Sequence, residues 1–318
     1  MRCNVTACWR RFCLMIIIFY LGTLMLPLAG CSPVATVKKT VKKLSRSVRS
    51  SEGDLKKRLG TVPFFNWSSF PDQNLEGILQ NNLVKSLNAA CGDLLVLTPE
   101  NKDYPLLLNH LPRLAAGGID NLALAKTGRK YGLNGIITGG FVDIAEKQEE
   151  RGFFWFRDTH YFVQLSINFE VYDTETGAKF FDESLVQEVE IEETDFELIR
   201  SKKEIIVSSI QDAILDLADE MGEHICDAVG SQPWKGYVAS VVKEKIIISS
   251  GSNTGIIPGQ LFEVYDSGNV IQGAEGQRFF VPGKKIGEIR INIVLPDKAV
   301  AVSVSGKGIK KGDSVRLK

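Results

Sequence analysis

The chain has 318 residues, 44% of them hydrophobic, and its 38 basic residues balance 38 acidic residues to a formal net charge of zero. That balance excludes a chain-wide electrostatic attraction to nucleic acid, and we expect no nucleic-acid partner. The length is sufficient for one large or two medium globular domains.

The first 30 residues have the pattern of an export signal. Three arginines precede an uncharged, apolar run at residues 12–28. A positive start, an apolar core and small residues before a cut site are typical of exported precursors. The run is also long enough to form a membrane-spanning helix, which is the alternative interpretation.

The motif Leu28-Ala29-Gly30-Cys31 favours the export signal, because it resembles the lipobox of bacterial lipoproteins. The resemblance implies that residues 1–30 are a signal peptide and that Cys31 becomes the lipidated amino terminus. Several acyl chains on one residue give durable membrane anchoring. Ser32 stands where an aspartate would signal retention in the inner membrane. We therefore expect an outer-membrane lipid anchor, with the protein on the periplasmic side.

Residues 31–59 are predicted to form a basic tether between the anchor and the folded part of the chain. Residues 38–58 contain nine Lys or Arg residues against two acidic ones, and no apolar face is broad enough for a core. The basic side chains either remain solvated on a spacer or rest on anionic headgroups.

Residues 60–230 alternate between strand and helix patterns. At residues 161–172 every second side chain is apolar, which is typical of a half-buried strand. The order of elements predicts an α+β domain in which helices cover one face of a mixed sheet. The predicted elements are strands at residues 60–67, Leu94–Leu97, 135–144, 161–172 and Lys179–Ile191, and helices at residues 73–90, Asn121–Tyr131 and 205–229.

Residues 231–318 contain only strand and turn patterns. Short apolar strands are separated by glycine-rich corners at residues 250–260 and 309–315. This spacing predicts a small all-β barrel that follows the α+β domain.

Two cysteines, Cys91 and Cys226, remain once the leader is removed and Cys31 is lipidated. An oxidising compartment permits a disulfide between them. The alternative is that each is a small buried residue on a helix face.

No segment has the pattern of a catalytic centre. Residues 251–255 lack the Gly-Lys-Ser/Thr ending of a phosphate-binding loop, and no Gly-x-Ser-x-Gly motif occurs. His110, His160 and His224 do not have metal-ligand spacing. The acidic residues at 188–197 are expected to solvate an edge strand rather than to bind cations. We expect no enzymatic activity, no metal, no cofactor and no small-molecule substrate.

Four consecutive aromatic residues, Phe153, Phe154, Trp155 and Phe156, lie between Arg151 and Arg157 in a predicted loop. Aromatic residues and arginine are enriched at the centres of protein interfaces, and tryptophan is also frequent at membrane interfaces. The run is interpreted as a surface for a partner protein or for self-association. Membrane insertion and local core packing are the alternatives.

The order of these motifs resembles a known family. The strand with Val62-Pro63-Phe64, the leucine-rich helix, the Gly135-Ile136-Ile137-Thr138-Gly139 strand and the turn at residues 173–177 are similar to the domain shared by the TolB amino-terminal domain, the curli secretion lipoprotein CsgG and the middle domain of the flagellar protein FlgT. Residues 231–318 resemble the carboxy-terminal domain of FlgT.

The resemblance implies a non-enzymatic structural or assembly factor under the outer membrane, at a flagellar-type or other envelope ring. The alternative is a CsgG-like oligomeric secretion channel, in which alternating strands such as residues 161–172 enter the outer membrane. The same alternation also fits a sheet that is covered by helices.

Overall fold

The structure is a computed structural model that describes residues 55–70, 73–201, 205, 208–274 and 276–318. The expected signal peptide, Cys31 and most of the expected tether lie outside the described residues. Among the helices that are described, none combines the length and the apolar character needed to cross a membrane.

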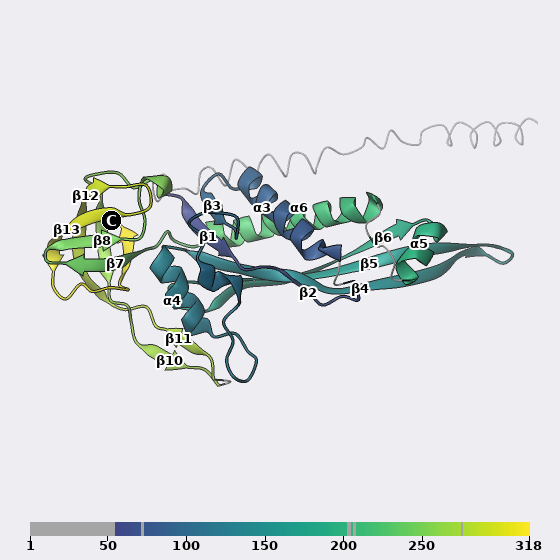
Figure 1. Cartoon of the computed structure of the whole chain (residues 1–318), viewed down its shortest axis with the longest axis horizontal. Helices are drawn as coiled ribbons and strands as arrows, with labels where there is room; N and C mark the ends of the chain where they lie inside the picture. The colour runs from purple at the N-terminus through teal and green to yellow at the C-terminus, as the bar shows by residue number, and fades with distance from the viewer. Residues whose placement is uncertain (1–54, 71–72, 202–204, 206–207, 275) are drawn as a thin grey trace, which may run out of the picture. The chain divides into compact units, whose positions relative to one another are not determined.

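A mixed sheet forms the centre of the first domain (Figure 1). Its strands follow the order β3-β1-β4-β5-β6, and β2 pairs with β4. The pairs β1–β3 and β1–β4 are parallel, whereas β4–β5 and β5–β6 are antiparallel. The strands are β1 (Lys57–Thr61), β2 (Phe65–Asn66), β3 (Leu94–Leu97), β4 (Gly135–Phe153), β5 (Phe156–Asp173) and β6 (Lys179–Ile191).

Two long helices, α3 (Leu75–Ala90) and α6 (Ser208–Gly230), cover one face of this sheet (Figure 1). Their apolar faces and alternate residues of β5 form the main core, which includes Leu79, Phe169 and Ile214. Fully burying such a side chain contributes about 1.5–3 kcal/mol. Helix α4 (Asn121–Tyr131) packs in a smaller core against Ile136, the neighbour of Ile137 in the main core. Since successive strand residues point to opposite faces, α4 covers the opposite face, and the expectation that all helices share one face is wrong.

The second domain is a closed antiparallel barrel with the strand order β12-β13-β8-β7-β14-β9. Hairpin β10–β11, which the sequence did not predict, lies outside this barrel. The α+β class, with a mixed sheet followed by a small all-β barrel, is confirmed. The strands are β7 (Gly236–Val242), β8 (Lys245–Ile248), β9 (Leu261–Tyr265), β10 (Val270–Gln272), β11 (Arg278–Phe280), β12 (Lys285–Val294), β13 (Ala299–Gly306) and β14 (Ser314–Leu317).

The folded part begins earlier than the predicted tether boundary at residue 59. Leu55 is buried in the barrel core, and strand β1 begins at Lys57. The Lys57 ammonium donates to the carbonyl groups of Val229 and Gly230 at the end of α6, at 3.0 and 3.2 Å. A lysine in this place satisfies the last carbonyl groups of a helix. The end of the predicted basic tether therefore belongs to the fold and is not a solvated spacer.

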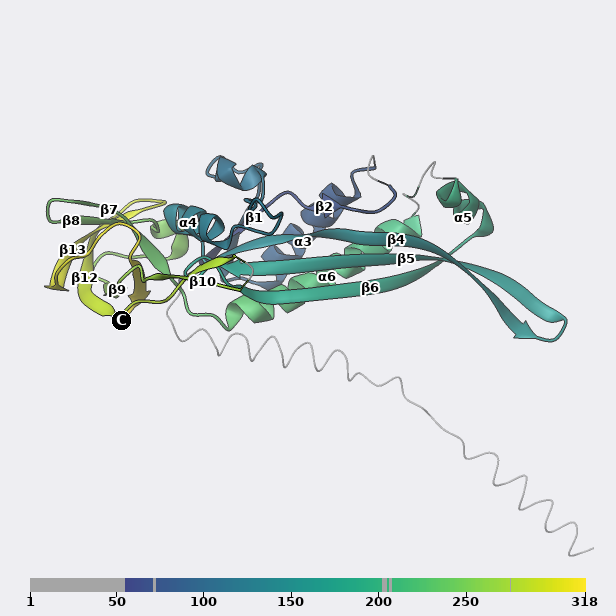
Figure 2. The same cartoon turned by 90° about the horizontal axis from the view of Figure 1, so that it is seen from below.

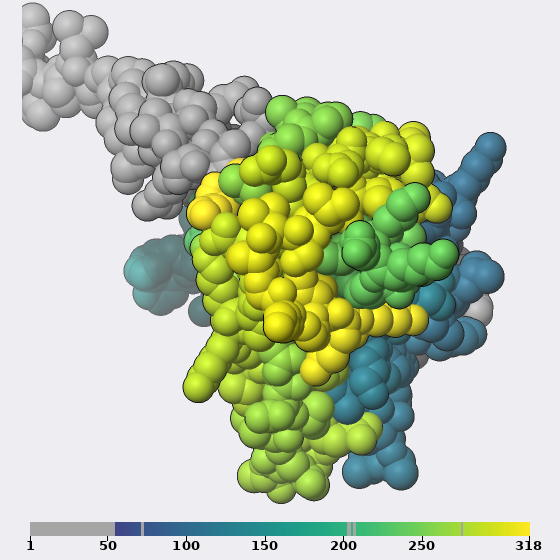
Figure 3. Space-filling view, turned by 90° about the vertical axis from the view of Figure 1, so that its left-hand side faces the viewer, coloured from purple at the N-terminus to yellow at the C-terminus, as the bar shows by residue number. Residues whose placement is uncertain are grey.

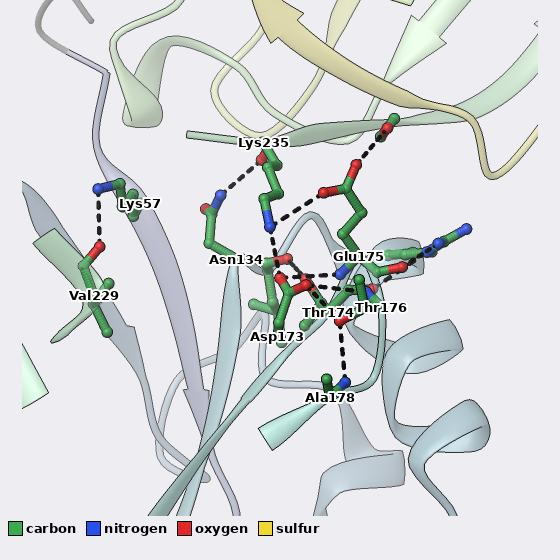
Figure 4. A network of polar contacts seen from close by, with 12 residues as sticks. Lys57, Asn134, Asp173, Thr174, Glu175, Thr176, Ala178, Val229 and Lys235 are labelled. Carbon is green, nitrogen blue, oxygen red and sulfur yellow. Dashed lines mark hydrogen bonds and ion pairs between the residues drawn. The ribbon is translucent and has the colours of Figure 1, made fainter. Parts of the chain in front are cut away.

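A buried polar cluster joins the sheet to the barrel (Figure 4). The Lys235 ammonium, just before β7, lies 2.8 Å from the Asp173 carboxylate and 3.2 Å from the Glu175 carboxylate in the turn after β5. Arg316 of β14 donates to both oxygens of the Glu175 carboxylate at 3.0 Å. All these groups except the Arg316 side chain are at least 89% buried.

Arg129 of α4 extends the same junction. Its guanidinium donates to the carbonyl groups of Thr174 and Glu175 in the turn, and to that of Gly312 before β14. The Tyr237 hydroxyl lies 2.9 Å from the Thr174 hydroxyl, and burial raises the pKa of Tyr237 well above its ordinary value. The neutral phenol therefore persists at physiological pH. Among the described residues, the buried Arg316 Nε of this junction has no hydrogen-bond partner.

A disulfide joins Cys91, at the end of α3, to Cys226 in α6. The two residues are 135 positions apart in the sequence, and their Cα atoms are separated by 6.0 Å. Both side chains are nearly inaccessible to solvent. The bond therefore fixes the two covering helices to each other within the main core.

We predict that Lys235→Met lowers the free energy of unfolding by about 3 kcal/mol, because it leaves two buried carboxylates without their shared cation. Denaturant unfolding followed by circular dichroism measures the loss. Lys285→Met is the matched control, since Lys285 makes two exposed ion pairs and its loss is expected to be much smaller. Equal losses in both variants would contradict a special role for the buried cluster.

We further predict that replacing both Cys91 and Cys226 with alanine lowers the free energy of unfolding by about 2–5 kcal/mol, because the closed loop is long. The addition of a reductant to the unsubstituted protein should produce most of the same loss, and it should have no effect on the double variant. Unfolding that is insensitive to reductant in both proteins would show that the bond does not form.

Candidate functional site: an exposed aromatic hairpin tip

The strands β4 and β5 continue past the rest of the sheet as a two-stranded ribbon (Figures 1 and 2). Strand β6 ends at Ile191, opposite Tyr161, and beyond this pair the described chain adds no third strand. The β4–β5 register continues from Gln148↔Tyr161 to Phe153↔Phe156. At about 3.4 Å per residue, the ribbon extends for about 17 Å.

The aromatic run Phe153–Phe156 lies at the end of this ribbon and is almost fully exposed. The exposed fractions of its side chains are 75% for Phe153, 67% for Phe154, 84% for Trp155 and 76% for Phe156. Ring contacts within the run join Phe153 to Phe154, with 4.4 Å between centroids, and Phe154 to Trp155, with 5.7 Å between centroids. Local core packing, one of the three interpretations of the run, is therefore wrong, because β6 and the helices end before they reach these rings.

The turn at the tip is not built from ordinary turn residues. Phe154 has a left-handed backbone conformation, with φ of 54°, which costs a residue other than glycine about 1–3 kcal/mol. Two-residue hairpin turns normally use Asn-Gly or Asp-Gly here. Gly152 has φ of 123°, and an added Cβ would lie 1.9 Å from the Phe156 carbonyl oxygen. The tip keeps its aromatic residues at the expense of local stability, which is typical of a functional position.

Charged residues of both signs lie directly behind the tip. Arg151 pairs with Glu149 at 2.9 Å, and Arg157 pairs with Glu150 at 3.4 Å. Hydrogen bonds from Lys147 and Arg151 lower the pKa of the Glu149 carboxyl. Hydrogen bonds to Glu149 and Glu188 raise the pKa of Lys147. Lys147 and Glu149 therefore remain charged at neutral pH, and the ion pairs of these residues form a polar collar around the ribbon.

The base of the ribbon is supported by helix α5 (Glu193–Arg200), which the sequence did not predict. The Phe196 ring packs on Tyr161 with 4.8 Å between centroids, and the Tyr161 hydroxyl donates to Glu193 at 3.1 Å. Partial desolvation of the phenol and the hydrogen bond to Glu193 raise the pKa of Tyr161. Glu193, Asp195 and Glu197 thus belong to a helix, and the expectation that all the acidic residues at 188–197 solvate an edge strand is wrong for these three.

The other residues that the sequence singled out do not join the tip. Cys91 and Cys226 lie in the helical core. His160 contacts Glu190 at 2.5 Å and His224 contacts Glu183 at 2.9 Å. Within the described ranges, no group of three or more His, Cys, Asp or Glu residues is arranged to hold a metal ion. The aromatic tip, residues Phe153–Phe156, is therefore the candidate functional site.

We predict that the double substitution Phe154→Ser/Trp155→Ser changes the free energy of unfolding by less than about 0.5 kcal/mol, because neither ring packs against the core. Phe169→Ala, which removes a fully buried ring, should cost about 3–5 kcal/mol. Denaturant unfolding of the two variants side by side measures both effects. A large loss in the tip variant would mean that these rings pack inside the fold.

No protein-family model matches the sequence, and no curated protein sequence matches it. Solved structures match about half of the chain. They include the hypothetical protein CT253 of Chlamydia trachomatis, with 11% identity over 56% of this chain and 99% of that chain and a TM-score of 0.36. A minor lipoprotein of Acinetobacter baumannii is 13% identical over 54% of this chain and 93% of that chain, with a TM-score of 0.29.

Lipoprotein GNA1162 of Neisseria meningitidis is 11% identical over 53% of this chain and 99% of that chain, with a TM-score of 0.31. With TM-scores this low, these similarities say nothing about function. We therefore take the function from the residues of this chain alone.

Proposed function

We propose that this chain is a non-enzymatic lipoprotein of the bacterial envelope that acts as a structural or assembly factor. In this proposal Cys31 holds it at the outer membrane on the periplasmic side, and the aromatic tip docks into a partner protein. A component of a flagellar-type or other envelope ring is the partner that the sequence resemblance favours.

The exposed aromatic tip is the observation that carries this proposal. With about 150–250 Å² for each aromatic side chain and the exposures given above, the tip presents about 600 Å² of apolar surface. Apolar patches of this size on soluble proteins mark binding sites. Tryptophan and arginine are the residues most enriched at interface hot spots. A two-stranded ribbon that presents them at its end can insert them into a pocket of a partner protein.

The charges behind the tip favour a protein partner over an anionic membrane surface. Glu149, Glu150 and Asp158 balance Lys147, Arg151 and Arg157 beside the rings, so the ribbon has no net positive charge to attract anionic headgroups. Mixed charges around an aromatic centre are instead the composition of a polar rim at a protein interface.

The same charges weigh against a CsgG-like channel. A strand that crosses a membrane as part of a barrel has one continuous apolar face about 9–11 residues long. In the ribbon, Glu150 and Arg157 lie on one face, and Arg151 and Asp158 lie on the other. Only the last pair, Phe153↔Phe156, is apolar. We therefore favour docking of the tip over a spanning hairpin.

The test is a crosslinking experiment in the native envelope, with a photoreactive amino acid at position 155. We expect a discrete crosslinked complex with one envelope protein. The affinity of that purified partner for the chain should fall on the order of 100-fold or more when Phe154 and Trp155 are both replaced with serine.

Leu106→Ser/Leu107→Ser is the matched control, because those side chains are 76% and 61% exposed but lie outside the tip. It should bind the partner with unchanged affinity. Crosslinks to lipid alone, together with loss of vesicle binding in the tip variant, would replace the protein partner with a membrane. Equal effects in both variants would remove the tip from the binding site.

A further inference from the structure

Charge is divided unevenly between the two domains. Residues 60–230 contain 13 basic and 29 acidic residues, a net charge of −16, whereas residues 231–318 contain 13 basic and 7 acidic residues, a net charge of +6. Copies of a protein with this division attract each other when the basic domain of one faces the acidic domain of the next.

The basic domain carries an aliphatic and basic patch on the outer surface of its barrel. Lys245 of β8 pairs with Val302 of β13, which pairs with Arg290 of β12. Val242 of β7 also lies opposite Lys245, and the exposed Val304 lies two residues after Val302, at an irregularity in the β12–β13 pairing. We call these five residues the barrel patch. Figure 3 shows this end of the molecule, where side chains of the green and yellow segments stand out from the surface.

The barrel patch faces outward. The neighbouring residues Ile246, Ile291 and Ala301 point into the barrel core, so the alternation of each strand directs the patch to the outside. Val242 and Val304 are 56% and 48% exposed. Among the described residues, neither Lys245 nor Arg290 forms an ion pair. Exposed valines beside unpaired cations fit an occupant that is both acidic and apolar.

Helix α6 provides a surface with that chemistry. Its solvent-facing side carries Asp212, Asp216, Asp219 and Glu220, with Leu215 among them at 44% exposure. The helix contains no lysine or arginine. Like charges spaced four residues apart, as in Asp212, Asp216 and Glu220, destabilise a helix, and a cationic partner removes that cost. We call these five residues the helix patch.

We propose that the barrel patch of one copy binds the helix patch of a second copy, so that the chain self-associates head to tail. Lys245 and Arg290 pair with the aspartates, and Leu215 packs against the valines. Because the two surfaces are different, the contact is heterologous, and it continues from copy to copy until a ring closes or a filament forms. The contact goes beyond the docking proposed for the aromatic tip and uses none of its residues.

The test measures the mass of the complete exported chain in detergent by size-exclusion chromatography with light scattering. At 0.05 M NaCl we expect species larger than a dimer. At 0.5 M NaCl we expect the association to weaken at least about tenfold, because salt screens exposed charges. Lys245→Glu/Arg290→Glu and Asp212→Lys/Asp216→Lys should each be monomeric alone.

Mixing these two variants is the decisive step, because each reversed patch then meets a complementary patch on the other chain. Assembly should return in the mixture. Lys284→Glu/Lys311→Glu has the same net charge as the first variant, at exposed barrel positions outside the patch, and should still assemble. The tip variant Phe154→Ser/Trp155→Ser should also assemble, which separates this proposal from the docking function.

Three results would overturn the proposal: a monomer at both salt concentrations, assembly that both reversed variants retain, or a mixture that stays monomeric. If the chain is monomeric and the barrel patch instead binds vesicles of phosphatidylglycerol, with binding lost in Lys245→Glu/Arg290→Glu, the occupant is an anionic lipid surface and not a second copy.

Discussion

The pairing of β4 with β5 is the interaction on which the rest of the structure depends. Antiparallel pairing extends from Gly135↔Asp173 to Phe153↔Phe156, with one register shift between Phe141 and Asp143. Its first end leads into the turn that binds the barrel, and its other end is the aromatic tip. A slip of one residue would exchange the two faces of β5, which would expose Val163, Leu165 and Ile167 and bury their polar neighbours. The core therefore fixes the register, and the register fixes both ends.

The buried cluster at Lys235 adds specificity to this arrangement. Two carboxylates in one turn, at Asp173 and Glu175, require a cation at a defined distance, and only the correct seating of the barrel brings Lys235 there. A buried ion pair adds little net stability compared with apolar packing, but it is costly when mismatched. The cluster therefore selects one orientation of the barrel on the sheet, whereas the hydrophobic cores provide most of the favourable free energy.

Local periodicity was enough to predict much of the fold. The helix Asn121–Tyr131 and the strands Leu94–Leu97 and Lys179–Ile191 lie where the sequence placed them, because each has its own apolar spacing or cap. Strand β4 extends nine residues beyond its predicted end at residue 144. Those extra residues are mostly charged, and they remain in a strand only because β5 pairs with them. The ion pair of Lys235 with Asp173 joins residues 62 positions apart, so no local pattern could indicate it.

The aromatic tip, too, was predictable from the sequence only in part. The run from Phe153 to Phe156 is visible in the sequence, but its exposure depends on where β6 and α5 end. Its features each oppose stability: exposed rings, a left-handed Phe154 and a turn without the usual Asn-Gly pair. Conflicts between local preference and fold are expected where function, rather than stability, determines the residues. Among the described residues, several such conflicts coincide where the sheet reaches beyond its covering helices, which supports the proposal that the tip is a binding surface.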